Sequence, residues 1–100
     1  MIYGITVEEF LALSPIEDSI VVNLTDEDLS SIIPAFSTFQ MSPTEVPNQL
    51  NKFSLENNYL FISNKGQQGE VLCRYFVEKG YHVNYLIGGL HSLQNHLVMA

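Results

Sequence analysis

Residues 60–69, LFISNKGQQG, predict an apolar strand that enters a short glycine-containing loop. The unbroken apolar stretch 60–62 is typical of a strand covered on both faces in a parallel sheet. Ser63 ends that stretch, and Gly66 and Gly69 permit positive φ and close backbone approach. This segment therefore favours a fold in which a buried parallel strand delivers a loop directly to a helix.

The helix predicted after the loop covers residues 70–79. Val71, Leu72, Tyr75 and Phe76 recur at helical spacing, and Gly80 supplies the stop that follows. A loop that leads into a helix aims unpaired amide N–H groups, and the positive end of the helix dipole, at whatever lies in front of it. The sequence thus predicts a backbone cradle for an anion.

The remaining elements alternate between strand and helix. Thr6 and Glu9 form a capping box, with Ile5 and Phe10 placed as a hydrophobic staple around it. The expected elements are helix 7–13, strand 20–24, a short acidic helix 26–32 capped by Thr25, strand 36–41, a helix with Pro47 in its first turn and Leu50 and Phe53 inward, strand 59–62, strand 82–86 and helix 90–97. This order predicts an α/β fold with a parallel sheet and helices on both faces.

Ligand sites in open parallel sheets lie outside the carboxyl ends of the strands. The loop that begins at Ser63 follows one such end, and residues 23–25 follow another. The expected site is therefore an anion- or ligand-binding loop with Asn23 and Thr25 on the pocket rim. The loop residues are Ser63, Asn64, Lys65, Gly66, Gln67, Gln68 and Gly69.

The strand and loop resemble the active-site segment of the rhodanese-like family of single-domain sulfurtransferases. In that family the strand ends in a cysteine that begins a six-residue loop closed by arginine, and the resemblance implies a persulfide held by the loop amides. Ser63 stands at the cysteine position and Gln68 at the arginine position. Gly66 matches the family pattern. The backbone features of the loop therefore agree with the family, whereas the reactive side chains differ from it.

The resemblance extends over nearly the whole chain. Residues 80–83 and 86–90 are similar to the family's last strand and its Gly-Gly turn, with Leu93 where a tryptophan usually follows. Residues 20–25 resemble the strand that ordinarily ends in Asp-Val-Arg, and residues 33–36 resemble Ile-Pro-Gly-Ala. The resemblance implies one rhodanese-like domain over residues 1–100, with three layers around a central parallel sheet of about five strands.

The departures from the family pattern are correlated. The cysteine, the loop arginine, the upstream Asp and Arg, and a histidine are replaced by Ser63, Gln68, Asn23, Thr25 and Ile32. A serine hydroxyl forms no stable persulfide and is a poor nucleophile without a base. These replacements predict a non-catalytic binding or regulatory module with a small-anion or protein partner.

Two enzymatic alternatives stay open at this point. The first is a sulfurtransferase with residual activity or with activity that depends on Cys73, the only cysteine. Because Cys73 shares a helix face with Phe76 and Val77, it is expected to fill the core. The second is a serine-based hydrolase or phosphatase-like enzyme using Ser63, which needs an oriented base nearby.

Charge and composition exclude several other classes. The net charge is −7, and residues 1–50 contain no Lys or Arg, so binding to nucleic acid or to anionic membranes is not expected. No cofactor motif is present, and His91 and His96 are five residues apart rather than four, which disfavours a zinc site. A lone cysteine, no membrane-length apolar run and no basic leader predict a cytoplasmic protein.

Overall fold

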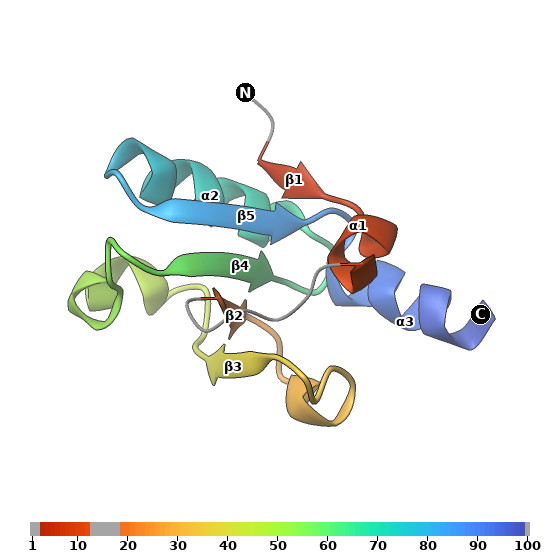
Figure 1. Ribbon diagram of the computed structural model, residues 1–100. Coiled ribbons are helices and arrows are strands. Elements are labelled where there is room, and N and C mark those ends of the chain that lie inside the picture. Colours follow the sequence, from red (N-terminus) through yellow and green to blue (C-terminus); the bar gives the residue numbers. More distant parts are fainter. Residues whose placement is uncertain (1–2, 13–18, 100) are drawn as a thin grey trace.

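Strands and helices alternate along residues 3–12 and 19–99, which are the residues described in a computed structural model (Figure 1). In chain order the elements are β1 (Gly4–Ile5), α1 (Val7–Ala12), β2 (Ser19–Asn23), η1 (Leu29–Ser31), β3 (Ser37–Gln40), η2 (Val46–Lys52), β4 (Asn58–Ile62), α2 (Gln67–Glu78), β5 (His82–Leu86) and α3 (Gly89–Met99). The labels η1 and η2 denote 3₁₀ helices.

The strands form one parallel sheet in the order β1-β5-β4-β2-β3. β4 lies in the middle, where Leu60 is paired with Val21 on one side and with Asn84 on the other. The predicted α/β fold with about five parallel strands is confirmed. β1 was not predicted, because a two-residue strand is too short to show a periodic pattern.

Alternate residues of β4 enter two separate cores, one on each face of the sheet. Tyr59 and Phe61 pack with α2 and η2, whereas Leu60 and Ile62 pack with residues of α1, η1 and α3. A strand buried on both faces has no polar side, which explains the continuous apolar run in the sequence. The predicted placement of helices on both faces is therefore confirmed.

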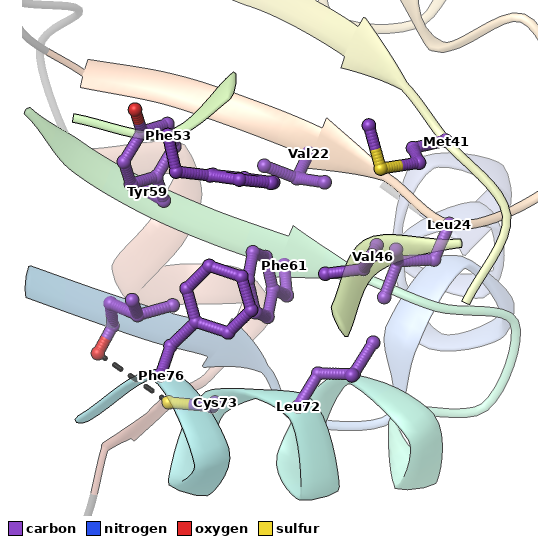
Figure 2. Close-up of a cluster of buried hydrophobic side chains, with 11 residues drawn as sticks. Val22, Leu24, Met41, Val46, Phe53, Tyr59, Phe61, Leu72, Cys73 and Phe76 are labelled. Atoms are coloured by element: carbon purple, nitrogen blue, oxygen red, sulfur yellow. Dashed lines mark hydrogen bonds between the residues drawn. The ribbon is translucent and has the colours of Figure 1, made fainter. Parts of the chain in front are cut away.

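The core beneath α2 is rich in aromatic rings (Figure 2). The ring of Phe76 lies 4.8 Å from that of Phe53 and 5.1 Å from that of Phe61, centroid to centroid, in edge-on contacts. Edge-to-face contacts of this kind add stability beyond the burial of apolar area. Leu72, Cys73 and Phe76 form the buried face of α2, while Val71, which the pattern had grouped with them, is 65% exposed.

The ends of two helices agree with the sequence. The N–H of Thr6 donates to Glu9 and the N–H of Glu9 donates to Thr6, which is the predicted capping box. At the end of α2, Gly80 has a φ of +92°, and the N–H of Tyr81 donates to the carbonyl of Phe76. This left-handed turn stops the helix as predicted. The predicted end of the first helix at Leu13 lies outside the described residues.

Several predicted boundaries were wrong. α2 begins at Gln67 rather than residue 70, because the turn to the helix is complete at Gly66, whose φ is +95°; Gly69 lies inside the helix and has no positive φ. The predicted helix 26–32 is reduced to η1, and Asp28, not Thr25, caps it by accepting from the N–H of Ser30.

The helix after β3 also differs from the prediction. η2 starts with Pro47 in its first turn as expected, but it is 3₁₀ and is kinked at Gln49, where φ is −121°. Phe53 is buried and Leu50 is partly buried, so both face the core as predicted. A short, kinked helix is sufficient here because it has only to carry Val46 and Phe53 into the aromatic core.

The fold places the carboxyl ends of its strands on one side. In Figure 1 the arrowheads of β1, β4 and β5 point toward the side where α3 begins.

Among residues 3–12 and 19–99, no helix combines the length and the apolar character needed to cross a bilayer.

Candidate functional site

The loop between β4 and α2 is built around Ser63. This side chain is 1% exposed, and its Oγ accepts hydrogen bonds from the N–H groups of Gly66 at 3.0 Å and Gly69 at 3.1 Å. Gly66 is required in the turn, since its φ is +95° and a Cβ there would lie 2.8 Å from the backbone nitrogen of Gly88. Ser63 therefore lies at the base of the predicted cradle, where its Oγ occupies two of the loop amides.

The hydrogen bonds of Ser63 leave it without an activating group. Both lone-pair directions of its Oγ are occupied by backbone donors. In the described part of the chain, no imidazole, carboxylate or amine hydrogen-bonds to this hydroxyl. A serine without a base in hydrogen-bond reach is a weak nucleophile. The site thus has the shape of a nucleophile loop without the proton acceptor that a serine enzyme needs.

The beginning of α3 locks the loop in place. The N–H of Leu90 donates to the carbonyl of Ser63 at 2.8 Å, and that of His91 donates to the carbonyl of Asn64 at 2.9 Å. Gly89 makes this approach possible, because a Cβ at this position would lie 2.1 Å from the carbonyl oxygen of Ser63. The Gly-Gly turn is therefore a structural support of the loop.

Four amides of the loop and of the first turn of α2 have no acceptor within the described residues. They belong to Asn64, Lys65, Gln67 and Gln68. The last two are at the N-terminus of α2, where the helix dipole favours negative charge. All four residues are exposed at the surface.

Glu70 is the acidic side chain in the first turn of α2, and its charge is already engaged. Its Oε2 lies 3.3 Å from the guanidinium of Arg74 and accepts from the hydroxyl of Tyr85 at 3.1 Å. Desolvation, followed by the hydrogen bond to Glu70, raises the pKa of Tyr85 above its ordinary value of 10.0. Tyr85 is therefore a hydrogen-bond donor at neutral pH, and it fixes α2 against β5.

Asn23 and Thr25, expected on the pocket rim, lie beneath it. Each is 3% exposed, and the hydroxyl of Thr25 donates to Oδ1 of Asn23 at 2.7 Å. Asn23 in turn donates from Nδ2 to the carbonyl of Glu27, and the N–H of Glu27 donates to Thr25. The two residues form a buried network that shapes the loop after β2 and leaves Glu27 on the rim.

A pocket of about 160 Å³ opens beside the loop. It is lined by Glu27, Asn64, Lys65, Leu90, His91 and Gln94. Asn64 and Lys65 belong to the predicted binding loop, whereas the other four lining residues were not among the predicted site residues. His91 was weighed as a metal ligand, although its place two residues after the Gly-Gly turn, near the carboxyl end of β5, was the available signal.

Gln67 and Gln68 border a different recess of about 290 Å³, which also contains Pro43, Val71 and Leu72. Gln68, at the position of the family's loop arginine, therefore does not share the polar pocket with Lys65.

In residues 3–12 and 19–99, no group of three or more His, Cys, Asp or Glu side chains is arranged to hold a metal ion.

Cys73 lies in the core, as its helical position predicted. It is fully buried, and its Sγ donates to the carbonyl of Val83 at 3.4 Å (Figure 2). Desolvation by burial raises the pKa of the Cys73 thiol from 9.0 to about 11, against a smaller opposing effect of Arg74. Because the thiolate is the reactive form of cysteine, this environment suppresses sulfur chemistry at Cys73.

We expect native Cys73 to react with a disulfide reagent such as DTNB at least about 100-fold more slowly at pH 8 than the urea-unfolded chain does. The shift of two pKa units lowers the thiolate fraction about 100-fold, and burial blocks access as well. Stopped-flow absorbance of the released thiolate measures both rates. Comparable rates in native buffer and in urea would show that the thiol is accessible.

Several solved structures have a backbone similar to that of this chain. A rhodanese-related protein from Thermoplasma volcanium is 14% identical, with a TM-score of 0.72 over 93% of this chain and 91% of that one. A rhodanese-like domain protein from Staphylococcus aureus is 23% identical, with a TM-score of 0.70 over 92% and 91%. A protein from Staphylococcus saprophyticus is 20% identical, with a TM-score of 0.72 over 92% and 93%.

No protein-family model and no curated protein matches the sequence. Each of these three structural matches covers nearly the full length of this chain and of the chain it is compared with, so this chain has the rhodanese-like fold. The resemblance that the loop and the Gly-Gly turn indicated is confirmed at the level of the fold.

Proposed function

We propose that this rhodanese-like domain is a non-catalytic binding module that holds a small anion at the loop of residues 63–69. The observation that carries the proposal is the set of amides around Ser63. The amides of Gly66 and Gly69 are occupied by its Oγ, whereas four neighbouring amides, which belong to exposed residues, have no acceptor among the described residues. Preorganised backbone donors at a helix N-terminus are a common anion site.

The side chains around the loop support binding rather than sulfur transfer. Ser63 has a hydroxyl in place of a thiol, and Gln68 brings no positive charge. Lys65 is the cation on the loop, and it lines the polar pocket. Cys73 is too deeply buried to substitute for a loop thiol. The proposal also assigns the protein to the cytoplasm, with which a lone reduced thiol is compatible.

An NMR titration with sodium sulfate tests the proposal. We expect saturable shifts of the amide signals of residues 64, 65, 67 and 68 at millimolar sulfate, because these donors face the ligand. Lys65→Met should weaken binding about fivefold, which corresponds to about 1 kcal/mol for one solvated ion pair. Lys52→Met is the matched control, since Lys52 is also exposed but lies at the end of η2.

Two results of this titration would contradict the proposal. The first is a set of small shifts that rise linearly with sulfate and are spread over the whole chain. The second is equal weakening by Lys65→Met and Lys52→Met, which would indicate general screening of charge instead of a local site.

A further inference from the structure

The pocket beside the loop contains two opposite charges that do not pair with each other. Glu27 and Lys65 both line the 160 Å³ cavity. Within the described residues, the ion pairs are Arg74 with Glu70 and His96 with Glu8, so neither Glu27 nor Lys65 has an ionic partner. Both charges are therefore available to a ligand in the space that separates them.

The backbone on both walls of the pocket is fixed by hydrogen bonds. On one wall, Glu27 donates its N–H to Thr25 at 3.1 Å and accepts from Nδ2 of Asn23 at 2.7 Å. On the other wall, the carbonyl of Asn64 accepts from the N–H of His91. Because Asn23 and Thr25 are buried, the backbone of Glu27 is held by the core, while its side chain is exposed.

The charges select the class of ligand. A simple anion is attracted by Lys65 but repelled by Glu27. A simple cation is attracted by Glu27 but repelled by Lys65. A small molecule with one carboxylate and one ammonium group satisfies both. The side-chain amides of Asn64 and Gln94 add neutral donors and acceptors to the same cavity.

The size of the pocket limits the ligand further. The pocket is an open recess of about 160 Å³, which is well above the room that a single water needs. This small recess suits an α-amino acid with a short side chain. Leu90 is the apolar residue of the lining.

We propose that the pocket between Glu27 and Lys65 binds a small zwitterion of the α-amino acid type, with its carboxylate at Lys65 and its ammonium group at Glu27. The inference rests on the proposed function through Lys65 and the loop. It deepens that function, because it identifies the anionic group of the ligand as one half of a zwitterion.

Three probes of nearly equal size test the proposal by NMR titration of the full chain at pH 7. They are L-alanine, which carries both charges, propionate, which lacks the ammonium group, and ethylammonium, which lacks the carboxylate. We expect L-alanine to saturate with a dissociation constant on the order of 1 mM and to shift the amides of residues 64, 65 and 91. Propionate and ethylammonium should each bind at least tenfold more weakly.

Glu27→Gln should weaken binding of L-alanine at least fivefold and leave that of propionate unchanged or stronger. The matched control is Glu56→Gln, because Glu56 is an exposed carboxylate outside this pocket and should leave both affinities unchanged. If propionate binds as tightly as L-alanine, the zwitterion proposal is overturned and the anion site stands. If neither propionate nor sulfate nor L-alanine saturates, both proposals are overturned.

Discussion

Gly89→Ala is expected to lower the free energy of unfolding by at least about 3 kcal/mol. The new Cβ would lie 2.1 Å from the carbonyl oxygen of Ser63, 2.7 Å from the nitrogen of Gly66 and 2.9 Å from the carbonyl carbon of Asn64. All three contacts are with backbone, so no side-chain rotation relieves them. Left-handed strain, overpacking and a weakened bond from Leu90 to Ser63 each cost about 1 kcal/mol or more.

Gly80→Ala is the matched control for this substitution. Gly80 also has a positive φ, +92°, but a Cβ there meets nothing within 4 Å. We expect a loss of about 1–2 kcal/mol from backbone strain alone. Urea denaturation of both variants measures the difference, and at roughly 4–8 °C per kcal/mol it should also be visible in thermal midpoints. Equal losses would show that the loop is not locked by α3.

Phe76→Ala is expected to cost about 3–5 kcal/mol, the range for removing a fully buried aromatic side chain. The ring of Phe76 is 0% exposed, and it lies between those of Phe53, Phe61 and Tyr81, 5.1 Å or less from each. Its removal leaves a cavity in the core that joins α2 and η2 to the sheet (Figure 2).

Phe76→Leu separates the effect of lost apolar volume from the effect of the lost aromatic ring. Leucine keeps most of the apolar volume, so its cost should stay below about 2 kcal/mol. Chemical denaturation with a shared m-value compares the two variants. If alanine and leucine destabilise equally, the aromatic cluster is not close-packed around Phe76.

The sequence predicted those parts of the fold whose signal is local. The run 60–62 indicates a doubly covered strand because both cores draw on it, and the capping box at Thr6 depends on residues only three apart. β1 was missed because Gly4 and Ile5 become a strand only through pairing with Tyr85 and Leu86. A strand of two residues has no pattern of its own, so tertiary pairing alone defines it.

The place of the loop in the fold was predicted, whereas the side chains that surround it were not. Ser63 and its loop lie at the carboxyl end of β4, as expected from a parallel sheet. Asn23 and Thr25 were expected to face a ligand, yet each satisfies the other in a buried network and Glu27 takes the rim. A sequence pattern does not reveal which polar side chain turns inward, because that choice depends on partners distant along the chain, such as Gln40, which donates to the carbonyl of Thr25.

Sulfur transfer from thiosulfate to cyanide, measured in parallel for the wild type and for Ser63→Cys, tests the central claim most directly. The claim is that the loop keeps a backbone cradle without the chemistry. We predict no turnover by the wild type, because Ser63 has no thiol and Cys73 is buried with a raised pKa. The variant should remain close to background, because Gln68 supplies no cation to bind thiosulfate. Clear turnover by the wild-type protein would contradict this account.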